Sequence, residues 1–347
     1  MVNSDPALAA LFLKQFAWCK VVGGESVAVL TEPESRETYA EAAQAAASAL
    51  GARPFRIVLP SHAGEVGAIA AINRGNASST ILDDLPEVTG VLSAVDFIVD
   101  LTLDGLIHSK QRAAIQKGGA RVLLVREPPD ALARLLPTAE RTARIARAAE
   151  RLGRAKTMTV TSAAGTNLRV DLAGAAVRGS PGFCDKPGSS ATWAIGAVLV
   201  YPPSAEIEGD VVLAPGDIVY PFYRYVDRPV TLRFKGGFVA EIEGDGVDAE
   251  LMRDYFARWG DPNAYGISHV GWGLHERALW DALAFYPKGE AAGVDGRCFA
   301  GNFLISTGPN YAANRHTACH FDLPMRHCTV ALDGEPVVET GRLVDRP

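Results

Sequence analysis

The hydrophobic periodicity of this 347-residue chain changes partway along. In the first part, apolar stretches at 26–31, 55–60, 95–101 and 121–125 alternate with helical patterns. Such alternation predicts parallel strands with helices packed on both faces, an open α/β sheet. Neither GxGxxG nor GxxxxGK[ST] follows any of these strands, so the sequence indicates no dinucleotide or nucleoside triphosphate site.

From about residue 155 the period becomes two, which is typical of short antiparallel strands. The chain also exceeds the size at which one core usually keeps growing, so two domains are expected. We therefore predict an α/β protein in which an N-terminal open α/β domain, 1–154, precedes a β-rich α+β metal-binding domain, 155–347. A helix from about 130 to 154 is expected to bridge the two, and further helices are expected near 247–259 and 273–285.

Net charge limits the kinds of molecule this chain can bind, and cysteine usage indicates the compartment in which it works. The net charge is -6 and no run of Lys or Arg forms a patch, which disfavours nucleic acids and anionic membranes and favours a small-molecule substrate. No stretch is apolar enough for a membrane span, and no secretory signal is evident at the start. The five cysteines form no CxxC pair, which fits reduced thiols in the cytoplasm: Cys19, Cys184, Cys298, Cys319 and Cys328.

A metal site is indicated by two separate segments. In CHFDL, strand alternation sends His320 and Asp322 to the same face. In GISHVGWG, His269 stands in an apolar piece closed by Gly271 and Gly273, which let backbone pass close to a ligand. Two imidazoles and one carboxylate match the facial triad of non-haem Fe(II) enzymes. A zinc hydrolase uses similar ligands, and spacing alone does not separate the two.

The remaining histidines carry weaker signals. His108 follows the carboxyl end of the strand at 95–101, the edge where open α/β sheets bind ligands, so it is a candidate catalytic residue. His275 is expected in a helix, packed or solvated, while His316 in a polar loop and His327 near a strand edge are attributed no role.

Three blocks resemble the 2,5-dihydroxypyridine 5,6-dioxygenase family: SHVGWGLHERALW at 268–280, CFAGNFLISTGPN at 298–310 and CHFDLPMRHCTVALDG at 319–334. The resemblance implies an enzyme of bacterial nicotinate, nicotine or picolinate breakdown that opens the substrate ring with O2 to give N-formylmaleamic acid. It also implies a homo-oligomer, and a lid near 184–196 whose substrate contacts the sequence does not assign.

By the same resemblance, the Fe(II) ligands fall on His269, His320 and Asp322, and the base that deprotonates the substrate falls on His108. The fold of this family is shared with thermophilic metallo-aminopeptidases, which are the main alternative. Those enzymes use glutamates to bridge two metals, whereas this chain offers His269 where an acidic ligand is expected. A binding protein with a structural metal is the third possibility.

Overall fold

The computed structural model describes residues 5–60, 79–203 and 206–344, which divide into two compact units. Unit 1 comprises residues up to 138 together with 181–195 and 290–292, and unit 2 comprises the rest. Unit 2 begins at Ala139 and so includes the helix that the sequence placed at the end of the first domain. Pro137 separates that helix from the preceding one, and the helix packs against strands of unit 2.

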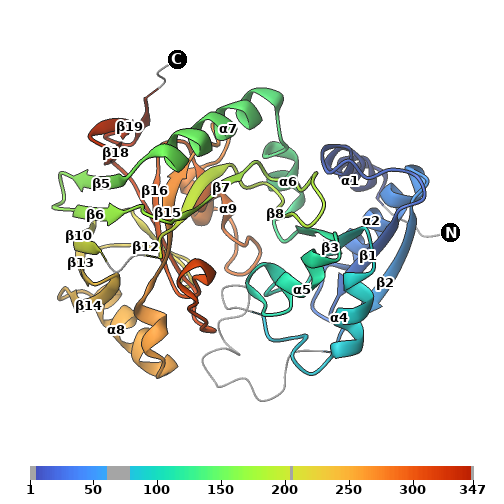
Figure 1. Cartoon of the computed structure of the whole chain (residues 1–347), viewed down its shortest axis with the longest axis horizontal. Coiled ribbons are helices and arrows are strands. Elements are labelled where there is room, and N and C mark those ends of the chain that lie inside the picture. Colours follow the sequence, from blue (N-terminus) through green and yellow to red (C-terminus); the bar gives the residue numbers. More distant parts are fainter. Residues whose placement is uncertain (1–4, 61–78, 204–205, 345–347) are drawn as a thin grey trace. The chain divides into compact units, whose positions relative to one another are not determined.

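Unit 1 is the expected open α/β sheet. Its five strands are all parallel, in the order β2-β1-β3-β4-β8 (Figure 1). The strands are β1 (Ser26–Thr31), β2 (Arg53–Val58), β3 (Phe97–Asp100), β4 (Arg121–Leu124) and β8 (Ser190–Thr192). The helices are α1 (Pro6–Trp18), α2 (Glu37–Ala49), α4 (Pro86–Ser93), α5 (Arg112–Lys117) and α6 (Pro129–Arg134), with the 3-10 helix η1 (Leu106–His108).

Side chains from alternate positions of these strands enter two different hydrophobic layers. On one face, Ile98 and Val122 join Leu92 of α4 and Ile115 of α5 in a single buried cluster. On the other face, the ring of Phe97 lies edge-on to Phe16 of α1, with centroids 5.3 Å apart. The sheet is therefore covered on both faces, as the near-continuous apolar strands predicted.

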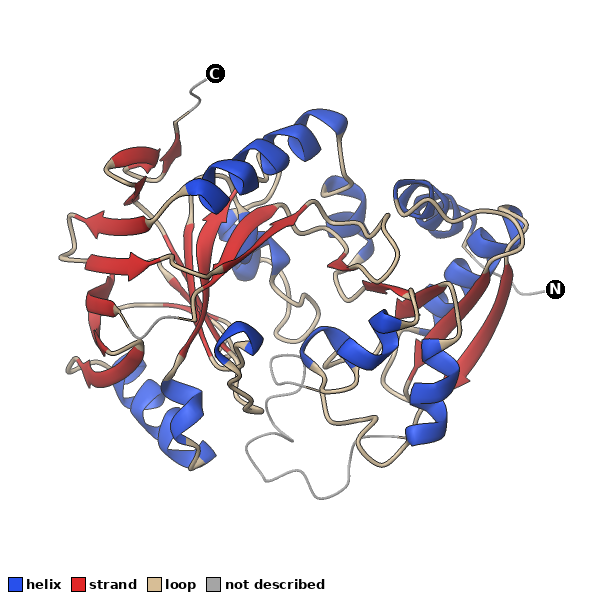
Figure 2. Ribbon diagram, viewed as in Figure 1, coloured by secondary structure: helices blue, strands red, loops and turns tan. Residues whose placement is uncertain are grey.

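Unit 2 is β-rich and antiparallel, as expected (Figure 2). An eight-stranded sheet has the order β14-β13-β10-β6-β5-β18-β19-β20, and a five-stranded sheet the order β17-β16-β15-β9-β7. The strands of the first sheet are β5 (Thr157–Ser162), β6 (Asn167–Asp171), β10 (Ile207–Leu213), β13 (Val230–Lys235), β14 (Phe238–Glu243), β18 (Cys328–Leu332), β19 (Glu335–Glu339) and β20 (Arg342–Leu343). Those of the second are β7 (Ala176–Ser180), β9 (Ala197–Tyr201), β15 (Ile267–Gly273), β16 (Phe303–Thr307) and β17 (Phe321–Met325).

Helices and short elements complete unit 2. They are α7 (Ala139–Arg154), α8 (Val247–Trp259), α9 (Val294–Cys298), η2 (Pro262–Tyr265), η3 (Trp280–Ala284), η4 (Tyr311–Ala313) and the β11 (Ile218–Val219) and β12 (Arg224–Tyr225) pair. The helix predicted near 247–259 is confirmed. The prediction of a helix over 273–285 was wrong, because β15 continues to Gly273 and only the short η3 follows. No helix in the described ranges has the length and apolar content needed to cross a membrane.

Candidate metal centre

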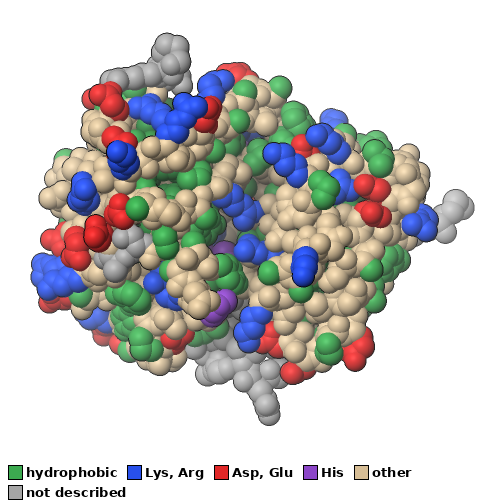
Figure 3. Space-filling view, viewed as in Figure 1, with side chains coloured by type: hydrophobic (Ala, Val, Ile, Leu, Met, Phe, Trp, Pro, Cys, Tyr) green, Lys and Arg blue, Asp and Glu red, His purple; other side chains and the backbone are tan. Residues whose placement is uncertain are grey.

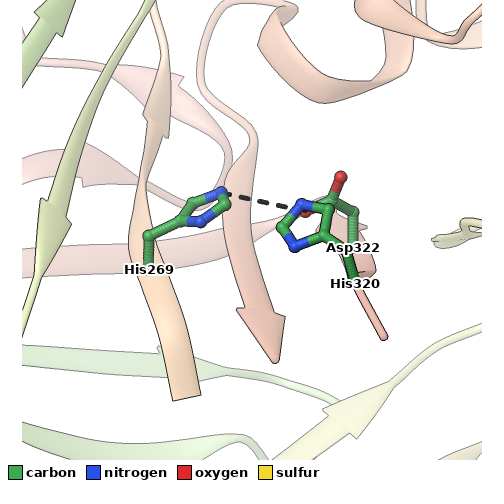
Figure 4. A group of neighbouring side chains, drawn as sticks. All are labelled: His269, His320 and Asp322. Atoms are coloured by element: carbon green, nitrogen blue, oxygen red, sulfur yellow. Dashed lines mark ion pairs between the residues drawn. The ribbon is translucent and has the colours of Figure 1, made fainter. Parts of the chain in front are cut away.

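Strand register brings the three predicted ligands together in unit 2. His269 on β15 lies opposite Ser306 on β16, and Ser306 lies opposite Asp322 on β17. His320 directly precedes β17 and points to the same side as Asp322, while Phe321 points into a cluster of aromatic rings. One ligand atom from each of His269, His320 and Asp322 lies within 4.8 Å of the others, and all three side chains are buried (Figure 4).

Two glycines allow the backbone to approach closely at this site. A Cβ at Gly271 of β15 would collide with the carbonyl oxygen of Val198 on β9. Gly308 has a φ of +120°, which side chains rarely adopt, and a Cβ there would meet the backbone of Cys319 and lie 3.2 Å from the Cα of His320. The close neighbour of Gly271 is thus strand backbone, whereas the sequence had suggested a ligand.

The protonation of His269 is set by its neighbour Ser268. The register shifts between Ile267 and His269, and the Ser268 hydroxyl donates to the carbonyl oxygen of Pro309 at 2.5 Å. Since that proton is committed, the hydroxyl oxygen accepts from Nδ1–H of His269 at 3.2 Å. Burial lowers the pKa of His269 to about 3, so the ring is neutral near pH 7. Its Nε2 therefore presents a lone pair.

Asp322 is held by charged and polar groups on both carboxylate oxygens. Its Oδ2 accepts from Nε of Arg297 at 2.5 Å, and its Oδ1 accepts from the Ser306 hydroxyl and lies 3.2 Å from Nε2 of His320. Burial alone would raise the pKa of Asp322, but the neighbouring His320 and the charge of Arg297 hold that pKa well below its ordinary value. The carboxylate is therefore ionised although it is only 3% exposed.

The donor set fits a divalent cation. The single Ser306 proton lies between two acceptors, Oδ1 of Asp322 and Nε2 of His269, which is 3.0 Å from the hydroxyl oxygen. More lone pairs than protons therefore face one point. Because Arg297 engages Oδ2, Asp322 offers Oδ1 as a single ligand atom. Two imidazoles and one carboxylate oxygen leave coordination positions open, as in mononuclear non-haem iron sites.

His108 lies in unit 1, half-buried at the end of η1, beyond the carboxyl end of β3 as the sequence indicated. A buried carboxylate shapes the intervening loop. Asp100 Oδ1 accepts from N and Oγ1 of Thr102 at 3.1 and 2.6 Å, and Oδ2 accepts from N of Leu106 at 2.6 Å. These bonds fix the start of η1 and hence the backbone that carries His108.

Three other histidines do not join the metal-ligand group. His275 is fully buried directly after β15, where its Nδ1 accepts from N of Arg277 at 3.2 Å. His316 is exposed and lies edge-on to Tyr311, with ring centroids 5.3 Å apart. His327 is exposed with a φ of 56°. The expectation that His275 lies in a helix was wrong, because the residue follows β15 in an irregular segment.

The sequence did not predict the roles of three residues around the candidate ligands: Ser268, Arg297 and Ser306. A serine or arginine has no spacing signature for this role, because its partner comes from another strand. Ser306 stands opposite both His269 and Asp322, but the strand alignment that places it there leaves no spacing signal in the sequence. Arg297 carries no such signal.

Comparisons with known proteins identify the family of this chain. The family model described as NicX, 2,5-dihydroxypyridine 5,6-dioxygenase, matches residues 7–345. The chain belongs to this family. A 2,5-dihydroxypyridine 5,6-dioxygenase from Pseudomonas putida KT2440 is 36% identical, over 99% of this chain and 98% of that protein. The family is one of dioxygenases, so the expectation of an enzyme of this class is confirmed.

Two solved structures share the fold of this chain. The structure of the 2,5-dihydroxypyridine dioxygenase from Pseudomonas putida KT2440 matches with a TM-score of 0.91 at 36% identity, covering 98% of this chain and 97% of that one. AmpT from Thermus thermophilus matches with a TM-score of 0.63 at 14% identity, covering 98% and 99%. The second match shows a shared fold, as the sequence resemblance implied.

Proposed function

We propose that this chain is a mononuclear non-haem Fe(II) dioxygenase that opens 2,5-dihydroxypyridine between C5 and C6. Both atoms of one O2 enter the ring to give N-formylmaleamic acid, so the substrate supplies all four electrons and no further reductant is needed. The observation that carries the proposal is the buried convergence of His269, His320 and Asp322 in a member of this dioxygenase family.

The bound iron would supply adjacent positions for the substrate hydroxyl oxygen and for O2. The protein's own residues prepare that site. Ser268 holds His269 in the tautomer with a free Nε2, and Arg297 restricts Asp322 to one ligand oxygen. The guanidinium of Arg297 is itself held over the ring of Tyr220, 3.9 Å from its centroid. Such outer partners fix ligand orientation and basicity.

We assign proton removal from the substrate hydroxyl to His108. An imidazole has a pKa near working pH without strong tuning, which suits a general base. Deprotonation makes the pyridine ring electron-rich and ready for oxidation. The hydrogen-bonded loop beginning at Asp100 supports this role, because it fixes the backbone that presents the imidazole.

We further propose that the enzyme works in the cytoplasm as a homo-oligomer, in bacterial breakdown of nicotinate, nicotine or picolinate. Its cysteines support a reducing compartment, because all five are buried as free thiols. The oligomer rests on the family resemblance.

Anaerobic reconstitution with Fe(II) followed by an oxygen-electrode assay tests the proposal. The wild type should bind one iron per chain and consume one O2 per 2,5-dihydroxypyridine. Alanine at His269, His320 or Asp322 should abolish iron binding and ring cleavage, whereas His108→Ala should keep its iron and lose turnover. His316→Ala is the matched control, because His316 is exposed and outside the ligand group.

The alternatives predict different results. An aminopeptidase would release an amino acid from a peptide amide without oxygen, and a structural metal site would consume no O2 with any dihydroxypyridine. A two-metal peptidase also needs bridging carboxylates. In the described part of the chain, the one group that could hold a metal contains a single carboxylate, Asp322. Stoichiometric iron in any two of the three ligand variants would refute the ligand assignment.

A further inference from the structure

A cavity of about 440 Å³ opens in unit 2 on the side of β15 away from the metal ligands. It lies between helix α7, β15 and the β19–β20 hairpin. Its apolar lining is formed by Ala148, Trp272, Leu274, Val337, Leu343 and Val344. The size falls within the range of small-molecule sites, which combine apolar walls with a few polar groups.

Strand alternation separates this cavity from the metal centre. His269 and Trp272 are three residues apart on β15, so their side chains point to opposite faces of the sheet. Trp272 and Leu274 are only 2% and 3% exposed, and they form the floor beneath α7. A molecule in the cavity would therefore touch no metal ligand.

The charged lining is strongly basic. One carboxylate, Glu150, lines the cavity. Four arginines of α7 line it as well: Arg144, Arg147, Arg151 and Arg154. At about 100° per residue, these four arginines fall within an arc of about 80° on the helix. Figure 3 shows Lys and Arg side chains gathered beside α7. A chain with a net charge of -6 thus concentrates positive charge at one cavity.

The four guanidinium groups differ in their ion pairs with the described residues. Arg144 is paired with Glu140 and Glu276, and Arg154 with Glu150. Arg147 and Arg151 form no ion pair with any described residue. They are one helical turn apart, a rise of about 6 Å, and each offers the planar fork that binds a carboxylate through two parallel hydrogen bonds.

We propose that this cavity binds a small organic carboxylate with an apolar body. The carboxylate pairs with Arg147 and Arg151 at the rim, and the apolar body lies over Trp272, Leu274 and Val337. Charge alone does not account for the site, because the floor is apolar. An apolar floor alone does not account for it either, since four cations surround the entrance.

Isothermal titration with 2-naphthoate tests the proposal, using 2-naphthamide as the uncharged analogue and inorganic phosphate as the anion without an apolar body. Wild-type protein should bind 2-naphthoate saturably, one per chain, at least about tenfold more tightly than either control. Equal binding of the amide or of phosphate would overturn the proposal, as would the absence of saturable binding.

Substitutions in the cavity test whether 2-naphthoate binds there. Combined Arg147→Gln and Arg151→Gln should weaken 2-naphthoate at least about tenfold. Ala148→Trp, which fills the cavity while keeping every charge, should do the same. Arg258→Gln is the matched control, because Arg258 is an exposed helical arginine of α8 in the same unit. Unchanged affinity in both cavity variants, or an equal loss in the control, would refute the assignment.

The same titration separates this site from the proposed metal centre. His269→Ala should bind 2-naphthoate as the wild type does, because His269 lies on the other face of β15. A loss of affinity in His269→Ala equal to that in the cavity variants would place the probe at the metal centre and overturn the proposal.

Discussion

Replacing Asp100 with asparagine tests how strongly a buried carboxylate fixes the loop that carries His108. The two oxygens of Asp100 accept three hydrogen bonds, from N and Oγ1 of Thr102 and from N of Leu106. In Asp100→Asn one oxygen becomes an NH2 group, so at least one buried backbone N–H faces a donor. An unsatisfied buried donor costs about 1–3 kcal/mol, and the remaining bonds lose an ionised acceptor.

An opposing effect reduces this cost. Burial raises the pKa of Asp100 above its ordinary value, so the neutral amide saves part of the desolvation that the carboxylate bears. We therefore expect a net destabilisation of about 1–2 kcal/mol. For a unit of this size that corresponds to a fall in Tm of about 2–8 °C.

Thermal unfolding followed by circular dichroism measures the stability change, and the oxygen-electrode assay measures turnover. Iron content should be unchanged in Asp100→Asn, because the proposed metal ligands lie in unit 2, while the proposed role of His108 predicts a lower turnover. Asp83→Asn is the control, since Asp83 is exposed and, among the pairs described, accepts hydrogen bonds only from the side chains of Lys110 and Gln111. Wild-type Tm and turnover in Asp100→Asn would refute the reasoning.

Three further predictions concern unit 2. Arg297→Leu removes the donor to Oδ2 of Asp322 and should weaken metal binding about 10–100-fold in chelator competition, with partial recovery in Arg297→Lys. The hydrogen bond and charge of Arg141 lower the pKa of Glu276 to about 2, so this pair stabilises the fold above pH 4.5 and its contribution is lost as pH falls from 4.5 towards 2. Glu276→Gln should lower the free energy of unfolding, measured with urea at pH 7, by about 1–2 kcal/mol after allowing for solvent screening. The same substitution should make the free energy of unfolding depend less on pH between 4.5 and 2. Gly271→Ala should separate β15 from β9 and leave protein without bound metal, read by metal analysis of whatever folded protein is recovered.

Local patterns in the sequence were enough to predict the α/β fold class and to single out three residues that the structure brings together, His269, His320 and Asp322. The β17 segment shows why: alternation alone sends His320 and Asp322 to one face and Phe321 to the other, and no distant contact changes that. The parallel sheet followed in the same way from apolar strands alternating with helices. The helix expected at 273–285 does not form, because the backbone of His275 pairs with that of Phe299. Phe299 lies 24 residues further along the sequence, so a local pattern does not reveal this contact.

The groups that tune the site could not be predicted, because each depends on register between strands or on packing between distant segments. Ser306 reaches Asp322 only because β16 pairs with β17 in one of several possible alignments, and a slip of one residue would turn its hydroxyl to the opposite face. Arg297 reaches the same carboxylate from α9, where no periodicity marks it. The candidate ligands are thus marked by local sequence, whereas the groups that set their tautomer, charge and number of ligand atoms are placed by strand pairing and by packing. Substitutions at Ser306 or Arg297 should therefore alter metal affinity while leaving the strand pattern of unit 2 intact, a distinction that far-ultraviolet circular dichroism and metal titration measure on the same sample.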